Sequence, residues 1–268
     1  MLVWISLDRW FVTFVAIGYL ALLFVIAYLG QKQSPTQWRS RPWIYSLALG
    51  VSCTSWAFYG TVGQAATTGA WLAPIYIGSI LCLVAAWPML LKILTIVKQQ
   101  NLTSIADFIA FRYDRSPMLA AAIALTVLIG TVPYIALQLR AISTSFDLLT
   151  GTYQSGISTA FVVTLVLIVF SILFGTRQIA ASKQNQGLML AIAVSSIVKL
   201  FALLAVGIFA TFYVFDGVEH LLAAQKQLPQ APVSNTYLAV SQAILGAITI
   251  FILPQQFHMM MIENHHQQ

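Results

Sequence analysis

Apolar residues gather in seven long runs along the chain, and short polar segments separate these runs. A membrane-spanning helix needs about 20 apolar residues, with a range near 17–25 and more where the helix tilts. Each run is long enough by this measure. The pattern predicts seven membrane-spanning helices, near residues 10–29, 44–62, 71–97, 118–137, 157–175, 188–215 and 237–253.

Prolines mark several of these predicted helices. Pro74 and Pro88 lie inside the third run and predict kinks there, because proline removes a helical hydrogen bond. Pro133 lies inside the fourth run, and Pro254 closes the last one.

Composition agrees with a membrane protein and excludes several other classes. Of the 268 residues, 59% are hydrophobic and only 7% are charged, whereas a soluble globular chain carries about 25% charged residues. Soluble enzymes, nucleic-acid binders and disordered chains are therefore excluded. Cys53 and Cys82 lie in apolar runs and form no disulfide framework. The expected fold is an all-helical, multi-pass membrane protein with one module over residues 1–268.

The distribution of basic residues predicts the orientation of the chain. The segments after the first, third and fifth runs carry eight Lys and Arg residues, and the alternate segments carry three. Basic loops stay in the cytoplasm, so the N-terminus is predicted outside and the C-terminus inside. The first run is too long for the apolar part of a cleavable signal peptide and is taken as a true span. Residues 216–235 are predicted to form an exposed loop outside the cytoplasm.

The second run is the most polar one and carries the first candidate site. Residues 50–63 contain three glycines and four hydroxyl side chains at membrane depth. Unpaired backbone groups are costly in lipid, so a broken helix persists there only where it lines a cavity or another helix. Transporters use such breaks to hold an ion or a solute near the bilayer midplane. Close helix packing through small residues is the alternative, and the sequence leaves both open.

A short amphipathic helix is predicted after the third run. Ser104 and Asp107 have the spacing of a capping box, which places a carboxylate in the first helical turn. Four apolar side chains then share one face: Leu102, Ile105, Phe108 and Ile109. The helix is expected on the cytoplasmic surface, against lipid headgroups or against the helical bundle.

Lys199 is a charged residue inside a predicted span. It is the twelfth residue of the sixth run, about 16 Å along the helix at 1.5 Å per residue and so near mid-bilayer. No Asp or Glu lies within any of the seven predicted spans. The ammonium is expected to use carbonyls, hydroxyls, water, an anionic solute or a residue beyond position 268, or to snorkel along a tilted helix.

Retinal, metal and enzymatic chemistry are not supported. A seven-span protein with a buried lysine also describes a retinal protein, but Lys199 lies in the sixth span and has no membrane carboxylate as counter-ion. His258, His265 and His266 follow the last run, in a tail more typical of a solvated segment than of a metal site. The sequence carries no nucleophile–base arrangement, phosphate loop or zinc spacing, so the chain is not expected to be an enzyme.

Several motifs resemble the sodium:solute symporter family. The family carries a Ser-x-x-[Asp/Glu]-Phe-[Leu/Ile]-x-x-Arg-[Tyr/Phe] segment after the third span, matched here in order by Ser104, Asp107, Phe108, Ile109, Arg112 and Tyr113. The second run resembles the family's first discontinuous helix, including Trp56 and Gly60. Residues 53–56, 195–200 and 253–258 resemble the branch in which this module forms the N-terminus of sensor histidine kinases.

The resemblance implies a LeuT-type fold, built from two inverted five-helix repeats after one extra N-terminal helix. The second run would be its first broken helix, and the seventh would open the second repeat. Sodium and solute sites would be bordered by residues of the second run: Gly50, Ser52, Cys53, Thr54, Ser55, Trp56 and Gly60. Na⁺ is the one cofactor implied, although some transporter members carry an acidic residue at the Ser52 position. The family continues with further helices after the seventh, so the chain is expected to be the N-terminal portion of the module.

Three functional hypotheses remain open. The first is the sensory input of a two-component histidine kinase, which binds or moves a small polar solute such as the amino acid histidine. The second is a sodium-coupled solute transporter, and the third is a membrane remnant without activity. The expected location is the bacterial inner membrane. The expected partners are the lipid bilayer, the solute, and a cytoplasmic kinase domain or the remaining helices; nucleic acid is not among them.

Substitutions in the complete protein test these site residues. Trp56→Ala and Ser55→Ala are expected to weaken solute binding, because both remove groups from the predicted site. Lys199→Ala is expected to damage folding, signalling or transport, since it removes the intramembrane charge. Solute binding, uptake and signalling are the measurements. Unchanged values for all three variants would contradict the assignment.

Overall fold

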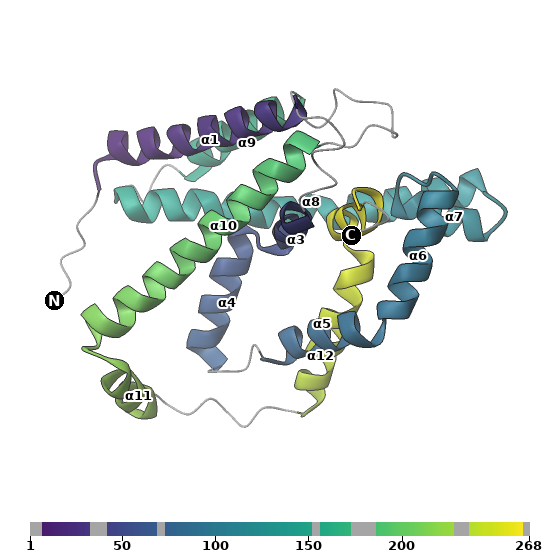
Figure 1. Ribbon diagram of the computed structural model, residues 1–268. Helices are drawn as coiled ribbons and strands as arrows, with labels where there is room; N and C mark the ends of the chain where they lie inside the picture. Colours follow the sequence, from purple (N-terminus) through teal and green to yellow (C-terminus); the bar gives the residue numbers. More distant parts are fainter. Residues whose placement is uncertain are drawn as a thin grey trace.

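The structure, a computed structural model, describes residues 7–32, 42–68, 73–151, 156–172, 186–227 and 236–264. Nearly all of these residues are helical and none of them forms a β-strand, which confirms the predicted all-helical fold over this part of the chain. In chain order (Figure 1) the segments are α1 (Arg9–Gln31), α3 (Pro42–Ala48), the 3₁₀ turn η1 (Leu49–Ser52), α4 (Ser55–Thr68), α5 (Ala73–Ala85), α6 (Trp87–Gln99), α7 (Ile105–Arg112), α8 (Pro117–Thr150), α9 (Gly156–Phe170), α10 (Gln186–Phe209), the π-helical η3 (Ala210–Val214), α11 (Val218–Gln227), α12 (Thr236–Ile252), α13 (Pro254–Phe257) and the π-helical η4 (His258–Ile262).

Several helices are long and apolar enough to cross a membrane. Among the described residues, three qualify alone: α1, α8 and the continuous stretch Gln186–Val214. Two bent pairs raise the number to five if each pair is one span. One pair joins α5 to α6 with a bend of 67°, and the other joins α12 to Pro254–Ile262 with a bend of 53°. These helices support the membrane assignment that composition predicted.

The second apolar run is a broken helix. α3 ends in η1, Cys53 and Thr54 are not helical, and α4 begins at Ser55. The sequence left open whether this run breaks, and the structure contains the break.

One of the two predicted proline kinks in the third run is present. The run bends by 67° at Ala86, two residues before Pro88, which lacks the N–H that would continue the helix. Pro74 lies in the first turn of α5, where an N–H has no helical partner, and does not kink that helix.

The expected loop over residues 216–235 differs from the prediction, because its described residues include α11.

The helix α8 extends well beyond its predicted end at Leu137. It continues to Thr150, and Pro133 does not end it. No glycine or proline occurs between Leu137 and Gly151, so the polar residues of this stretch remain helical. The sequence analysis counted Arg140 among the segments between spans, whereas the structure places it on a helix.

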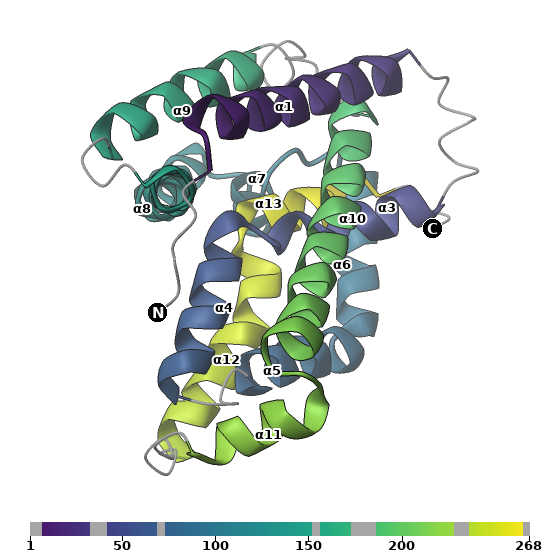
Figure 2. The ribbon, with the colours of Figure 1, turned by 90° about the vertical axis from the view of Figure 1, so that its left-hand side faces the viewer.

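The helices run in two main directions. α1, α8 and α9 lie roughly crosswise to α4 and α12 in both views (Figures 1 and 2). α10 contacts α1 of the first group, and it also contacts α3 and η1, the segments that precede α4. At the α1 contact, a Cβ on Gly187 would lie 2.1 Å from the carbonyl oxygen of Ala27. Only glycine permits this approach.

The last described segment, Pro254–Ile262, belongs to two hydrophobic cores. The first core joins α3, α10 and η4, and consists of Ile44, Ala48, Met189, Ala193 and Met259. The second joins α6 to α13 and η4, and consists of Leu90, Ile93, Leu94, Val97, Phe257 and Met261. The segment therefore connects the second apolar run to the third.

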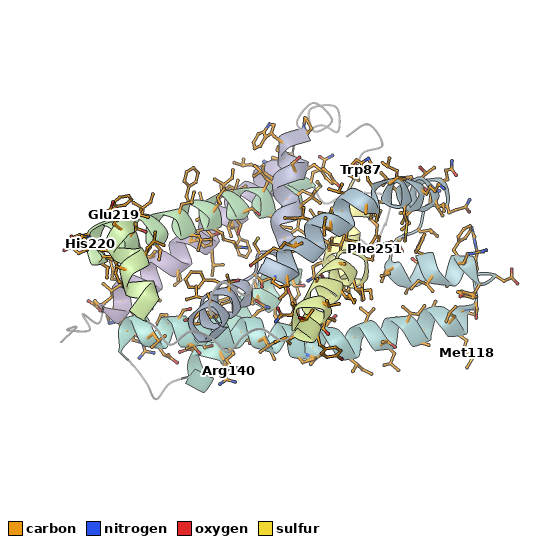
Figure 3. The ribbon with its side chains drawn as sticks, turned by 90° about the horizontal axis from the view of Figure 1, so that it is seen from below. Trp87, Met118, Arg140, Glu219, His220 and Phe251 are labelled. Carbon is orange, nitrogen blue, oxygen red and sulfur yellow. The ribbon has the colours of Figure 1, made fainter. Side chains whose placement is uncertain are left out.

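Much apolar surface remains exposed. The accessible surface is 18304 Å², against about 11,500 Å² for a compact soluble monomer of this mass. Met118 on α8 is 84% exposed and Phe14 on α1 is 77% exposed. Figure 3 shows side chains projecting along the helices, with Met118 and Arg140 both on α8. Lipid tails are as apolar as these side chains, so a membrane removes the need to bury them.

The contact between α5 and α12 leaves no room for a side chain at Gly246. A Cβ there would lie 2.3 Å from the carbonyl oxygen of Ile75. Gly246→Ala is expected to lower the free energy of unfolding by about 2–3 kcal/mol, because the helices must separate. Thermal unfolding in detergent measures the change. Gly207→Ala is the control, since nothing lies within 4 Å of that position, and equal losses in both variants would contradict the expectation.

Candidate functional site

The candidate site is the helix break at Cys53 and Thr54. Cys53 has φ −78° and ψ 84°, outside the helical region, so the helix cannot continue through it. Its N–H donates to the Gly50 carbonyl at 2.9 Å, and the Thr54 N–H donates to the Ser52 carbonyl at 3.0 Å. Serine and threonine favour such ends because their hydroxyls compete with helical hydrogen bonds. The carbonyl of Cys53 lies outside both helical segments.

Gly50 brings η1 close to α10. A Cβ at Gly50 would lie 2.6 Å from the Ser196 hydroxyl oxygen and 3.0 Å from its Cβ. Close packing and the helix break therefore occur together in this run, although the sequence had presented them as alternatives. Lys199 follows Ser196 by three residues and shares its face of α10. The packing at Gly50 thus turns Lys199 toward the break.

The ammonium of Lys199 binds the break directly. Its Nζ donates to the carbonyl oxygen of Cys53 at 2.8 Å. Lys199 lies at the middle of Gln186–Val214, the helical stretch that is long enough to span a membrane. Among the partners that the sequence allowed, a backbone carbonyl is the one in the structure. A hydrogen bond from an ionised donor is stronger than a neutral one, so this contact stabilises both groups.

A second bond joins the break to the last segment of the chain. The Ser52 hydroxyl donates to Oε1 of Gln256 on α13. Nearby, the Tyr45 hydroxyl donates to the Met260 carbonyl at 3.2 Å. Leu253, which separates α12 from α13, is itself extended with φ −64° and ψ 118°. The two interrupted apolar segments are therefore bonded to each other.

A third set of bonds ties α4 to α8. The Ser55 hydroxyl lies 3.0 Å from Oε1 of Gln138 and 3.2 Å from its carbonyl oxygen, and donates to them. One turn further along α4, the Tyr59 hydroxyl lies 3.0 Å from the Ser145 hydroxyl. These polar pairs align two helices that are otherwise mainly apolar.

Two further predicted site residues lie on α4, after the break. Gly60 lies on α4, beyond the first turn after the break. Trp56 belongs to the first turn of α4, but its side chain lies outside the described part of the chain.

The predicted capping box at α7 is present with one change. Ser104 has φ −153° and ψ 164°, and its hydroxyl accepts a hydrogen bond from the Asp107 N–H at 3.0 Å. The Asp107 carboxylate binds the Thr103 N–H at 3.2 Å and the Thr103 hydroxyl, one residue before the cap. The motif therefore fixes the start of α7.

The apolar face of α7 packs against the helical bundle. Three of its predicted side chains contact the second core: Leu102, Ile105 and Phe108. The rings of Phe108 and Phe257 lie 5.8 Å apart. Arg112 ends the helix, and Tyr113 after it is exposed. The segment from Ser104 to Tyr113 thus packs α7 against α13, and it forms no part of the break.

A cavity of about 450 Å³ lies between α7, α8 and the last segment. Its lining is mostly apolar and includes Val127, Leu128 and Phe257, with Ser104 and His258 among the polar members. None of the residues of the break lines it. The polar network at the break and this cavity are therefore separate features.

The end of the last segment carries charged groups. Glu263 is only 3% exposed, and its Oε1 lies 3.3 Å from Nε2 of His258. Lys98 on α6 donates to the carbonyl of Ile262. In the described ranges, no three His, Cys, Asp or Glu side chains converge as metal ligands. His265 and His266 lie outside those ranges.

The charge of Lys199 disfavours a free sodium ion at the break. The Cys53 carbonyl accepts a hydrogen bond from this ammonium, while the Ser52 and Ser55 hydroxyls donate their protons to glutamine side chains and keep their lone pairs. A second unit charge about 4 Å from the ammonium would be repelled by about 4 kcal/mol at an effective dielectric constant of 20. Lys199 thus places its own charge at the carbonyl where a sodium ion would bind.

Comparison with known proteins identifies no relative: no family model, curated protein or solved structure matches the chain.

Sequence reasoning missed four residues of this network: Gln138, Gln256, Tyr59 and Ser145. The two glutamines were assigned to segments just after a predicted span. A signal existed for the first, because Gln138 and Ser145 are seven residues apart and therefore share a face of a continuing helix. No local pattern could pair Gln256 with Ser52, since the two residues are far apart in the chain.

A double-mutant cycle tests the bond between the two interrupted segments. Ser52→Ala and Gln256→Ala are expected to couple by about 1 kcal/mol in thermal unfolding, because each removes the same hydrogen bond. The control pairs Ser52→Ala with Thr126→Ala, whose hydroxyl bonds only to its own helix at Ala122. Additive effects in the first pair would show that the bond is not formed.

Proposed function

We propose that this chain is a symporter-like membrane module that binds a small polar solute at the helix break. We further propose that it is the sensory input of a two-component histidine kinase in the bacterial inner membrane. The observation that carries the proposal is the break itself, whose Cys53 carbonyl, Ser52 hydroxyl and Ser55 hydroxyl bind three other helices.

The break supplies what a solute site in a membrane requires. Backbone and hydroxyl groups that leave a helix are available to bind a polar ligand, and they persist in lipid only where other groups pair with them. Here the partners come from three helices: α8, α10 and α13. A small polar solute that exchanges hydrogen bonds with these side chains gains affinity without leaving unpaired groups.

A sensory role is supported by a chain of contacts that leads from the break to α7. Ser52 binds Gln256, the next residue Phe257 packs in the second core, and its ring meets Phe108 of α7. A solute that competes for the Ser52 hydroxyl would change the free energy of this docked segment. Ligands shift such equilibria by their difference in affinity for the two states.

The finer architecture belongs to the same proposal. We propose seven spans in a partial LeuT-type bundle, with the N-terminus outside and the C-terminus in the cytoplasm. The break at Cys53 and the extended Leu253 would be the two interrupted positions of the inverted repeats. Labelling of single cysteines from either side of the membrane tests this orientation.

A sodium-coupled transporter is the second candidate. The bent pair of α12 and the last segment favours this candidate, because a bent span is a feature that alternating access could use. The coding sequence after the Gln268 codon separates the hypotheses. A histidine-kinase core there supports the sensor, further spans alone support the transporter, and unrelated sequence supports a remnant without activity.

Solute binding is tested with the purified protein in lipid nanodiscs and a panel of the twenty amino acids. A ligand at a hundred times its dissociation constant is expected to stabilise the protein by about 2.7 kcal/mol, seen as a higher unfolding temperature. Ser55→Ala is expected to weaken binding about tenfold, since the alignment of α4 with α8 loses a hydrogen bond.

Ser241→Ala is the matched control for this experiment. Its hydroxyl is on α12 and donates only to Tyr237 of the same helix, so solute affinity is expected to stay unchanged. Equal losses of affinity in Ser55→Ala and Ser241→Ala would show that the break is not part of the solute site.

A further inference from the structure

We infer that the ammonium of Lys199 is the resident cation of the helix break and replaces a free sodium ion there. The inference rests on the proposed function only in treating the break as the binding site. Its test uses sodium alone, so it can fail while solute binding is observed, and solute binding can fail while it succeeds.

The position of the Lys199 ammonium places a positive charge at the break. Lys199 Nζ lies 2.8 Å from the Cys53 carbonyl oxygen, within the range of a strong hydrogen bond. The packing of Gly50 on Ser196 holds η1 against the same face of α10. Backbone contact, and not only a flexible side chain, therefore sets where the ammonium can reach.

The segments that form the break and the helix that carries Lys199 contain no carboxylate to balance its charge. Residues 42–68, which include α3, η1 and α4, contain no Asp or Glu. Within Gln186–Val214, Lys199 is the one ionisable acid or base other than tyrosine. A charge inside a membrane needs a partner, and carbonyl groups can supply it. One cation satisfies this carbonyl site, and no nearby carboxylate of these segments would hold a second.

A sodium ion and the Lys199 ammonium would compete for the Cys53 carbonyl. A sodium ion at the same carbonyl would lie about 4 Å from the ammonium. At an effective dielectric constant of 20, the repulsion at that distance weakens binding on the order of a thousandfold. Sodium binding at the break is therefore expected to be unmeasurable at physiological concentrations while Lys199 is charged.

The experiment measures ²²Na⁺ binding and the unfolding temperature of the protein in nanodiscs. Sodium chloride is compared with choline chloride at the same ionic strength, for the unchanged protein, Lys199→Met and Lys199→Arg. Methionine is unbranched like lysine, is one atom shorter and removes the charge. Lys92→Met on α6 is the matched control, because it removes a lysine that lies on a different helix.

The unchanged protein, Lys199→Arg and Lys92→Met are expected to bind no ²²Na⁺ saturably and to unfold at the same temperature in both salts. Lys199→Met is expected to unfold several degrees lower in choline, and sodium is expected to restore part of this loss saturably. Saturable ²²Na⁺ binding by the unchanged protein would overturn the inference. So would a folded Lys199→Met variant that is neither destabilised nor sensitive to sodium.

If Lys199→Met does not fold, the unchanged protein and Lys199→Arg still decide the question. Sodium-dependent stability in either of them contradicts a resident ammonium. Identical behaviour of both in the two salts supports it.

Discussion

The structure depends on one constraint: the backbone and hydroxyl groups at a broken helix must find partners in apolar surroundings. Leaving such a group unpaired costs several kcal/mol in a membrane interior. At the break, Lys199 binds the Cys53 carbonyl, and the Ser52 hydroxyl binds Gln256. Each bond reaches a different helix, so the same requirement that stabilises the break also fixes where α10 and α13 lie.

The segment Pro254–Ile262 carries this constraint to the rest of the fold. It begins after the extended Leu253, and its side chains pack in both hydrophobic cores. Phe257 meets Phe108 of α7, while Gln256 meets Ser52 at the break. Neighbouring residues of one short segment therefore contact the candidate solute site and the amphipathic helix. This arrangement is the physical basis of the proposed sensory role.

The candidate site was only partly predictable. The hydroxyl and glycine residues of the second run indicated where a break could occur, because their effect on a helix is local, but close helix packing was an equally open alternative. The charge of Lys199 inside an apolar run indicated that it needed a partner, but several partners were equally acceptable. Gln138 and Gln256 could not be assigned, since their roles follow from helices that meet in space. The role of Trp56 stays a prediction, as do the sodium:solute symporter resemblance and the orientation.

The sequence by itself determined what depends on composition and on near neighbours. It determined the apolar runs, the all-helical class, the cap at Ser104 and the stop at Pro254, because solvent preference and local hydrogen bonds act within a few residues. The tertiary structure decided the pairing of Ser52 with Gln256 and the choice of Cys53 as partner of Lys199. These features depend on which helices pack together, and contacts between distant residues leave no periodic signal in the chain.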